Sequence, residues 1–504
     1  MKKEIGKIIG ILVFIAVLLA PVDPAIIPVD ARYVAAVTLL MAIFWVTEAV
    51  PLEVTALLPI ILFPLLGVLS IREATTPYAD PVIFLFLGGF IIAMSMQRWG
   101  LHRRIALSII NIVGTSPRRL VLGFMVATGF LSMWISNTAT AMMMIPIAIA
   151  IIATVMPSVN AKLDEMNEEQ RDFAGCLVIA VAYAANIGGI ATIIGSPPNG
   201  IFIAQMKVLF PLAPTIDFFT WMKFGVPLAA IFIPIVWLWL IKVPYRHLPQ
   251  KLSQAKDVIE QEMEELGPMS RGEKWTLFVF LLTAFSWIFA STKVIGGTTI
   301  PGLDQVFPGI NDTVIAIFGA LLLFFLPVDM KKGIFTMNWE WAQKIPWGIL
   351  ILFGGGLCLS AAFISSGLAK LIVNSFTMLS LLPIVAIVLI VAIAVSLLTE
   401  VSSNTAIASV MMPIMAVTAI SMGIHPYILM LTAAVCASLA FMLPVATPPN
   451  AVAYGTGYID MKTLFKSGWA LNLMGVVFWT FFLFTVVIWA IGFTPDLPAW
   501  AVNP

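Results

Sequence analysis

Apolar segments long enough to cross a lipid bilayer recur along almost the whole chain. One follows the N-terminal lysines and ends near Ala20, and ten others lie at about 32–50, 53–69, 82–98, 173–204, 224–241, 275–291, 313–326, 347–364, 427–454 and 469–492. Inside a bilayer every backbone N–H and C=O group needs a partner within the protein, so such segments fold as helices or closed barrels. The sequence predicts an all-α polytopic membrane protein with eleven transmembrane helices.

Composition excludes two other classes of protein. Hydrophobic residues make up 61% of the 504 residues, mean hydropathy is +1.03 and only 11% of residues are charged. Soluble domains carry about 25% charged residues, so a soluble enzyme is excluded. The formal net charge of +1 leaves no basic patch for a nucleic-acid partner. Cys176, Cys358 and Cys436 stand singly in apolar runs, which indicates buried thiols rather than disulfides or a metal cluster.

Two further apolar stretches, at about 120–156 and 382–420, are interrupted near their middles by polar residues. Irregular backbone at membrane depth is tolerated only where protein or a water-filled cavity surrounds it. We therefore interpret each stretch as a re-entrant hairpin, which enters and leaves the membrane on the same side.

The distribution of basic residues predicts the orientation of the chain. With the N-terminus in the cytoplasm and the segments alternating, 21 of the 27 Lys and Arg residues fall on the cytoplasmic side and 6 outside. This bias fits the positive-inside rule. We expect a multi-pass protein of the plasma membrane with a cytoplasmic N-terminus and an extracellular C-terminus.

An internal repeat is the strongest signal in the sequence. Residues 135–146 read ISNTATAMMMIP and residues 402–413 read SSNTAIASVMMP, with seven of twelve positions identical at a spacing of 267. Downstream, the motif Gly195-Ser-Pro-Pro-Asn199 matches Ala446-Thr-Pro-Pro-Asn450 at a spacing of 251. Matched blocks in one order indicate a duplicated structural unit.

Each repeat would hold five crossings and one hairpin, so the second would be inverted relative to the first. Inverted repeats with interrupted helices at corresponding positions are typical of secondary transporters. The predicted organisation is an N-terminal span and external loop at 1–31, repeat 1 at 32–241, a cytoplasmic linker at 242–274, repeat 2 at 275–492 and an external tail at 493–504.

The repeated motifs suggest a binding site for ions. Paired prolines remove backbone donors and disfavour helix in the preceding residue, so the segments 173–204 and 427–454 should be broken helices with free carbonyl oxygens. Such oxygens, with those of Ser, Thr and Asn, suit Na⁺, whereas helix N-termini and neutral donors suit an anion. Two similar clusters without Lys or Arg favour a ligand with two similar ends, such as a dicarboxylate. A single motif could instead be a kink or a packing contact.

Glu400 is the one carboxylate deep in an apolar stretch. Ionisable residues inside a membrane mark functional sites by default, but such an acid can also serve the structure by accepting hydrogen bonds from nearby backbone. Both interpretations are open for Glu400.

The sequence resembles the divalent anion:sodium symporter family, the dicarboxylate transporters of the INDY type. The motifs that carry the resemblance are Ser136-Asn-Thr138, Ser403-Asn-Thr405 and the two Pro-Pro-Asn segments, with Leu398-Thr-Glu400 ahead of the second Ser-Asn-Thr. The resemblance covers essentially the whole chain. It implies a homodimer in which each protomer has a scaffold domain and a moving transport domain, an elevator mechanism.

The resemblance also implies the residues of the site. Substrate carboxylates would meet Asn137, Thr138, Ser196 and Pro197 from one repeat and Asn404, Thr405, Thr447 and Pro448 from the other. One Na⁺ site would use Ser132, Ser136, Asn137 and Gly195, and a second would use Thr399, Ser402, Asn404 and Ala446, partly through backbone oxygens. Asn186 stands where the family often has serine, which could alter the adjacent Na⁺ site.

The function expected from the resemblance is secondary active transport of C4–C5 dicarboxylates such as succinate, fumarate, malate and 2-oxoglutarate. Coupling to Na⁺ symport and dicarboxylate exchange are both open, since both kinds of transporter carry Ser-Asn-Thr motifs. Sulfate or citrate is the alternative substrate. No catalytic dyad or metal set lies at membrane depth in the sequence, so no enzyme and no resident cofactor is expected; Na⁺ is a possible coupling ion.

Overall fold

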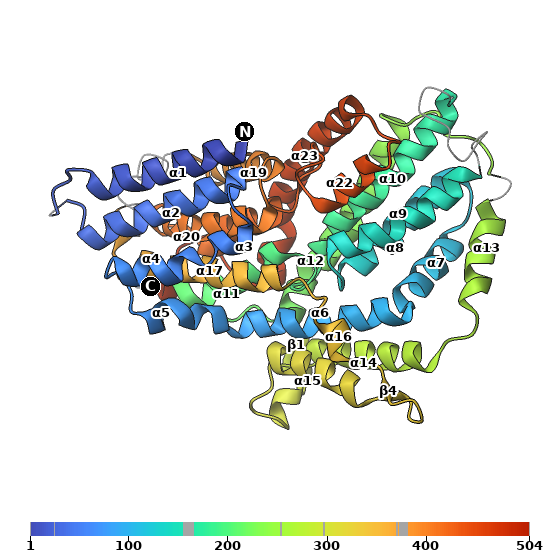
Figure 1. The fold of residues 1–504 in the computed structure, drawn as a ribbon, viewed down its shortest axis with the longest axis horizontal. Coiled ribbons are helices and arrows are strands. Elements are labelled where there is room, and N and C mark those ends of the chain that lie inside the picture. Colours follow the sequence, from blue (N-terminus) through green and yellow to red (C-terminus); the bar gives the residue numbers. More distant parts are fainter. Residues whose placement is uncertain are drawn as a thin grey trace.

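The computed structural model describes residues 2–24, 26–154, 166–252, 255–295, 298–368, 371 and 382–502. Helices make up most of this part of the chain, and the predicted all-helical membrane fold is confirmed (Figure 1). Seven helical stretches among the described residues are long and apolar enough to cross a membrane: Val29–Thr47, Ile71–Trp99, Glu168–Gly189, Phe218–Lys242, Trp347–Ser365, Asn404–Ser421 and Met461–Ile491. The number of eleven crossings stays a prediction.

The first half of the chain is helical throughout its described part. Its elements are α1 (Lys2–Leu19), α2 (Val29–Thr47), α3 (Leu52–Thr55), α4 (Leu58–Leu65), α5 (Ile71–Thr75), η1 (Thr76–Ala79), α6 (Pro81–Trp99), α7 (Leu101–Val113), α8 (Pro117–Ser132), α9 (Asn137–Ala153), α10 (Glu168–Gly189), α11 (Pro197–Leu209) and α12 (Phe218–Lys242). The stretch 120–156 forms two helices, α8 and α9, that meet at a polar turn. The predicted span 173–204 is likewise broken, into α10 and α11.

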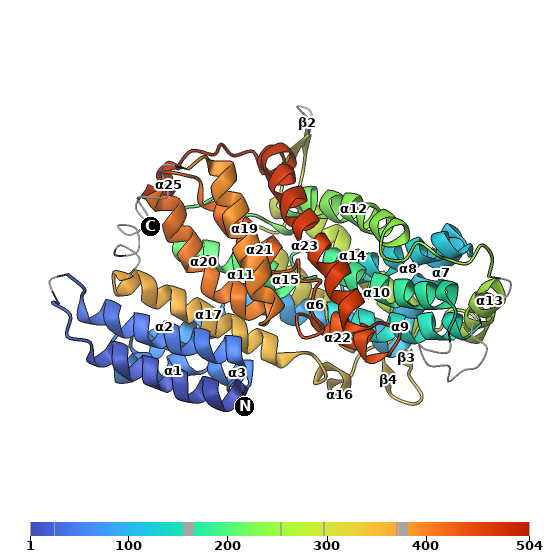
Figure 2. The same cartoon turned by 90° about the horizontal axis from the view of Figure 1, so that it is seen from above.

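The second half of the chain follows after a linker, and its helices lie beside those of the first half (Figure 2). Its elements are α13 (Ala255–Leu266), α14 (Arg271–Ile288), β1 (Lys293–Ile295), β2 (Thr298–Ile300), η3 (Leu303–Gln305), α15 (Asp312–Phe325), β3 (Pro327–Asp329), β4 (Ile334–Phe335), α16 (Trp339–Ala342), α17 (Trp347–Ser365), α19 (Ile384–Glu400), α20 (Asn404–Ser421), α21 (Pro426–Cys436), α22 (Pro448–Gly455), α23 (Met461–Phe482), η5 (Leu483–Val487), α24 (Ile488–Ile491) and α25 (Ala499–Val502). Helices α19 and α20 form the second two-helix turn, and α21 and α22 form the second broken helix.

Three features of the fold were not predicted from the sequence. Helix α7 carries basic residues on one face and apolar residues on the other, and it lies along the connection between α6 and α8. The chain also forms two short antiparallel hairpins, β1–β2 and β3–β4, in the loops on either side of α15.

Lys370, one of the basic residues used to predict orientation, lies outside the described residues.

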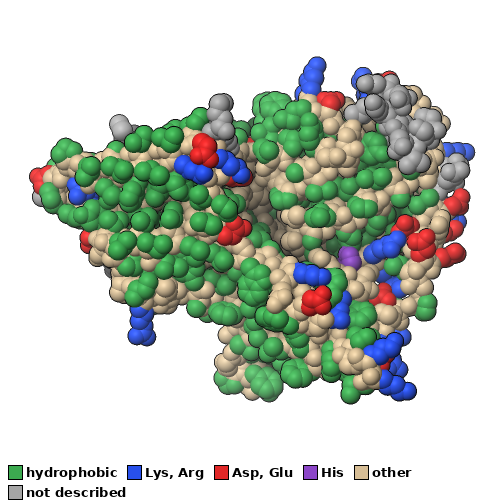
Figure 3. All heavy atoms as spheres, viewed as in Figure 1, with side chains coloured by type: hydrophobic (Ala, Val, Ile, Leu, Met, Phe, Trp, Pro, Cys, Tyr) green, Lys and Arg blue, Asp and Glu red, His purple; other side chains and the backbone are tan. Residues whose placement is uncertain are grey.

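The centre of the molecule is formed by matching helices of the two halves. Every residue of α10 from Phe173 to Gly189 is buried, and so is every residue of α21. By contrast, α1 carries exposed Ile8, Leu12 and Leu19. Hydrophobic side chains cover much of the face drawn in Figure 3, above all the part formed by the N-terminal helices. An apolar outer surface is what a helical protein presents to lipid.

The linker helix α13 packs on protein. Its Ala255 and Ile259 are fully buried, and α13 lies beside α7 and α9. Arg103 of α7 forms an ion pair with Glu262 of α13, and Arg104 Nε lies 2.7 Å from Glu273 Oε1 at the start of α14. The predicted connector therefore ties α7 to the beginning of the second half.

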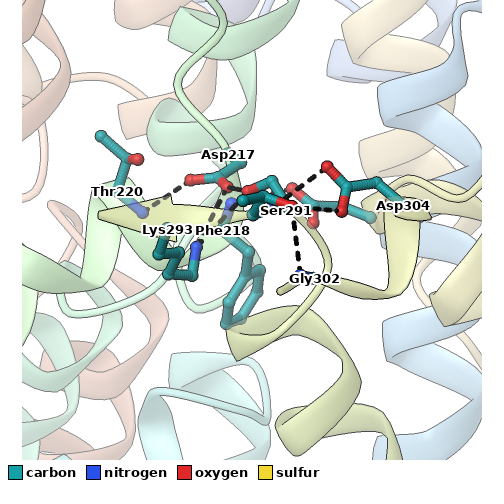
Figure 4. A network of polar contacts seen from close by, with 9 residues as sticks. Asp217, Phe218, Thr220, Ser291, Lys293, Gly302 and Asp304 are labelled. Carbon is teal, nitrogen blue, oxygen red and sulfur yellow. Dashed lines mark hydrogen bonds and ion pairs between the residues drawn. The ribbon is translucent and has the colours of Figure 1, made fainter. Parts of the chain in front are cut away.

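A polar network joins α12 to the loop that follows α14 (Figure 4). Asp217 caps α12 through the Thr220 N–H at 2.8 Å, accepts a hydrogen bond from Ser291 Oγ at 2.6 Å, and lies 3.6 Å from Lys293 Nζ. Burial by itself would raise the pKa of Asp217, but these hydrogen bonds and Lys293 hold it below its ordinary value. The network thus fixes the beginning of α12 against elements of the second half.

Gly188 of α10 lies directly against the backbone of Gly129 of α8. A Cβ atom at residue 188 would lie 2.2 Å from the carbonyl oxygen of Gly129 and 2.5 Å from its Cα. Backbone atoms cannot yield as a side chain can, and overpacking a core costs about 1–3 kcal/mol or more. We expect Gly188→Ala to lower the thermal unfolding temperature of the purified protein by several degrees, about 2 °C per kcal/mol or more.

Gly455→Ala is the matched control, because a Cβ there meets nothing within 4 Å and the residue is the last of α22. It should leave the unfolding temperature unchanged or raise it slightly. Equal unfolding temperatures for Gly188→Ala and Gly455→Ala would contradict the close contact.

Candidate functional site

A cavity of about 570 Å³ lies where the two polar turns and the two broken helices meet. Its lining includes Ser136, Asn137, Thr138, Gly195, Ser196, Pro197, Ser403, Asn404, Thr405, Ala446, Thr447 and Pro448. All eight residues predicted to bind substrate are among these, so the structure brings them together from four separate segments. Among the described residues that line the cavity there is no Lys or Arg, as the sequence predicts.

Four helices begin at this cavity. The N-cap residues of α9, α11, α20 and α22 are Ser136, Ser196, Ser403 and Thr447, and each lines it. A helix N-terminus carries unpaired N–H groups and the equivalent of roughly half a positive charge. Helix N-termini are established binding positions for carboxylate and phosphate groups. The cavity is therefore favourable for an anion although no basic side chain lines it.

Oxygen atoms of the first half converge on the side chain of Asn137. Ser132 Oγ lies 2.5 Å from Asn137 Oδ1 and donates to the Ala185 carbonyl at 2.7 Å. Turning the amide end for end would place its nitrogen 3.2 Å from the Gly195 carbonyl and 3.1 Å from the Ala185 carbonyl. The amide oxygen faces only other oxygens in this orientation, and turning the amide gives both of its ends partners.

The second half repeats this arrangement with different residues. Thr399 Oγ1 lies 2.6 Å from Asn404 Oδ1 and donates to the Ala437 carbonyl at 2.9 Å. Thr399 and Asn404 are the counterparts of Ser132 and Asn137 at the spacing of 267. The sequence predicts all four residues, and the structure gives each pair the same contact.

Not every predicted side chain points toward this oxygen cluster. Ser402 is buried and its hydroxyl donates to the Trp45 carbonyl on α2 at 3.2 Å. Ser136 Oγ accepts from the Ala139 N–H at 3.4 Å as the N-cap of α9. Gly195 and Ala446 line the cavity at the ends of the two unwound segments.

The asparagines of the two Pro-Pro-Asn motifs hold the unwound segments in place. Asn199 Nδ2 donates to the carbonyls of Gly189 at 3.0 Å and Thr192 at 2.7 Å. Asn450 Nδ2 donates to the carbonyls of Ala440 at 3.0 Å and Leu443 at 3.2 Å. In both repeats the acceptors lie ten and seven residues before the asparagine. These bonds satisfy carbonyl groups that the broken helix leaves free.

Glu400 also holds the second unwound segment in place, by accepting hydrogen bonds from its N–H groups. Its carboxylate accepts from the backbone N–H groups of Phe441, Met442 and Leu443 at 2.8–3.1 Å and from Asn472 Nδ2 at 2.6 Å. Glu400 is 2% exposed and does not line the cavity. Of the two interpretations that the sequence leaves open, the contacts favour the structural one.

Sequence reasoning missed the wall of the cavity opposite the motifs. This wall comes from Glu48, Leu52, Phe90 and Ile349, on or beside α2, α3, α6 and α17. Glu48 has a left-handed backbone with φ +49° at the end of α2, and its carboxylate lies 3.9 Å from Lys3 Nζ. In the sequence, Glu48 and Glu53 flank the junction of two apolar segments at Pro51, and this was the one signal for the region, since the apolar residues resemble any packing residue.

Comparison with known proteins agrees with these observations. A family model described as the sodium:sulfate symporter transmembrane region matches residues 1–492. The chain is 41% identical to the sodium-dependent dicarboxylate transporter SdcS of Staphylococcus saprophyticus, over 94% of this chain and 89% of that protein. It is 40% identical to SdcS of Staphylococcus aureus over the same shares.

Two solved structures have a similar fold. The YdaH transporter of Alcanivorax borkumensis matches with a TM-score of 0.57 and 16% identity, over 86% of this chain and 88% of that one. MtrF of Neisseria gonorrhoeae matches with a TM-score of 0.58 and 11% identity, over 83% of each chain. At this level of identity the two structures support the fold alone.

The family model that matches and the relatives named above are of membrane transporters, which defines the chain as a membrane transport protein rather than an enzyme. The match over residues 1–492 then gives the family. The chain belongs to the sodium:sulfate symporter family, the divalent anion:sodium symporters, and the resemblance noted from its motifs is confirmed.

Proposed function

We propose that this protein is a Na⁺-coupled symporter that takes C4–C5 dicarboxylates into the cell. The observation that carries the proposal is the pair of matched oxygen clusters, Ser132–Asn137 and Thr399–Asn404, beside a cavity where four helices begin. A dicarboxylate has two similar ends for two similar half-sites. Relatives that are 40–41% identical are named sodium-dependent dicarboxylate transporters, which favours symport over exchange.

In this proposal the substrate carboxylates bind at the helix N-termini. One carboxylate meets Asn137 and Thr138, with Ser196 and Pro197 completing its half-site, and the other meets Asn404, Thr405, Thr447 and Pro448. One Na⁺ is held by Ser132, Ser136, Asn137 and Gly195, and the second by Thr399, Ser402, Asn404 and Ala446. Bound Na⁺ supplies positive charge that no Lys or Arg of the described lining provides, so each cation strengthens binding of the anion.

We further propose that the protein is a homodimer, with its N-terminus in the cytoplasm, and that it works as an elevator. The two polar turns and the two broken helices would move together as the transport domain. The helices of the opposite wall, α2, α3 and α17, would belong to the scaffold. The elevator part of this proposal is supported by the cavity, because residues of both sets of elements line it.

Uptake of radioactive succinate into proteoliposomes tests the proposal. We expect an inward Na⁺ gradient to drive accumulation in vesicles that hold no internal substrate, and replacement of Na⁺ by choline to abolish it. Uptake that needs internal succinate and ignores Na⁺ would establish exchange instead. Competition by unlabelled sulfate or citrate stronger than competition by malate would show that another anion is the substrate.

A further inference from the structure

Asn186 is a buried amide of α10 that reaches into the other repeat. Its Nδ2 lies 3.1 Å from Thr447 Oγ1, 3.4 Å from Asn450 Oδ1 and 3.4 Å from the Ala440 carbonyl. Three oxygen atoms around one nitrogen fix which way the amide faces. The residue is fully buried, and its Oδ1 has no hydrogen-bond partner among the described residues.

The partner of Asn186 is a residue of the proposed substrate site. Thr447 caps α22 and lines the cavity, and its Oγ1 also accepts from the Asn450 N–H at 3.3 Å. A hydroxyl oxygen has two lone pairs and one proton to donate. Since Asn186 and Asn450 occupy both lone pairs, the Thr447 proton must point elsewhere. Within the described part of the chain the Thr447 hydroxyl donates to no acceptor.

The other half of the chain has a different arrangement. Ser438 lies just before the second unwound segment, and Ser196 is the counterpart of Thr447 at the spacing of 251. Ser438 Oγ and Ser196 Oγ lie 3.0 Å apart, and either hydroxyl could be the donor. The proton of Ser196 is therefore free to take two directions, whereas that of Thr447 has one.

We propose that Asn186 is a positioning residue for substrate recognition. By occupying a lone pair of Thr447 Oγ1, its amide fixes the Thr447 hydroxyl as a donor to one carboxylate of the bound dianion. The inference rests on the proposed function and adds a residue that lines the same cavity but acts through Thr447. This role also explains why Asn186 is kept although its Oδ1 is unpaired. A buried acceptor without a partner destabilises the fold, so it persists where the rest of the amide has a role.

Kinetics of succinate uptake by the full-length protein in proteoliposomes test this role. We expect Asn186→Ala to raise KM roughly five- to twentyfold with the maximal rate within about a factor of two of the wild type. Thr447→Val should raise KM by at least as much. Because both changes remove the same interaction, the double variant should be no worse than Thr447→Val by itself.

Asn186→Ser is the second variant, since serine keeps a hydrogen-bonding side chain at this position. It should fold and give an intermediate KM, because a serine hydroxyl can either donate to Thr447 or accept from it. Asn111→Ala, at an exposed position of α7, is the control for an asparagine-to-alanine change and should keep the wild-type KM.

The outcomes separate this inference from the proposed function. KM increases that multiply in the double variant, or a loss of maximal rate at unchanged KM in Asn186→Ala and Asn186→Ser, would overturn the role of Asn186 while Na⁺-driven uptake by the wild type stood. Absence of succinate uptake by the wild type would overturn the proposed function, and the inference with it.

Discussion

Asn137→Ala and Asn404→Ala should each reduce Na⁺-driven succinate uptake to background, a loss of about a hundredfold or more. Each asparagine lies against a hydroxyl of its own repeat, Ser132 Oγ at 2.5 Å or Thr399 Oγ1 at 2.6 Å, and also lines the cavity. In the proposed mechanism the same side chain contacts both a coupling ion and a substrate carboxylate. Its removal therefore weakens both ligands at once, and initial rates of uptake in proteoliposomes measure the result.

The control for this pair is again Asn111→Ala, whose side chain is exposed and far along the sequence from either motif. It should transport at the wild-type rate. A second measurement is the dependence of the residual rate on Na⁺ concentration, which should shift to higher concentration in both variants. Either variant retaining wild-type uptake would remove the basis for two matched half-sites.

Glu400→Ala should abolish transport by a different route, through the fold of the second unwound segment. The substitution leaves the N–H groups of Met442 and Leu443 and the Asn472 Nδ2 group without their acceptor, whereas the Phe441 N–H keeps Asn472 Oδ1 at 3.1 Å. A buried donor without a partner costs about 1–3 kcal/mol. We expect a loss of about 3 kcal/mol or more in the free energy of unfolding, read as a lower thermal unfolding temperature of the purified protein.

Glu400→Gln keeps one acceptor oxygen but turns an NH₂ group toward N–H donors, so it should be intermediate in both stability and uptake. Glu340→Ala, an exposed acid of α16, is the matched control and should behave as wild type. A normal unfolding temperature with abolished uptake in Glu400→Ala would instead assign Glu400 a direct part in transport.

The motifs could be predicted from the sequence because they occur twice. Asn137 and Asn404 lie in identical Ser-Asn-Thr triplets, and paired prolines follow Ser196 and Thr447. Duplication identifies both halves of a site, and proline chemistry predicts where a helix must break. The structure accordingly brings these residues to one cavity.

The remainder of the site depends on tertiary packing. Phe90 and Ile349 line the cavity, but apolar residues in apolar helices carry no signal in one sequence. In the sequence, Asn186 stands out only as a departure from the family pattern. The residue to which it bonds, Thr447, lies 261 positions further along the chain. The β1–β2 hairpin was missed because three-residue strands in a loop have too little length to show an alternating pattern.

The hydrogen bonds that Asn199 and Asn450 make to the unwound segments also limit where the chain can change in length. Asn199 and Asn450 each bind carbonyls ten and seven residues earlier in the chain. The spacing between the two repeats stays at 251 across the stretches that join these carbonyls to the asparagines, 189–199 and 440–450. One inserted residue would move those carbonyls out of reach of the amide. The difference of 16 in spacing between the repeats arises before these stretches, and much of it lies in the connection from α9 to α10, which has 14 residues against 4 between α20 and α21. Insertions and deletions should therefore be tolerated in that connection and rejected at 189–199 and 440–450.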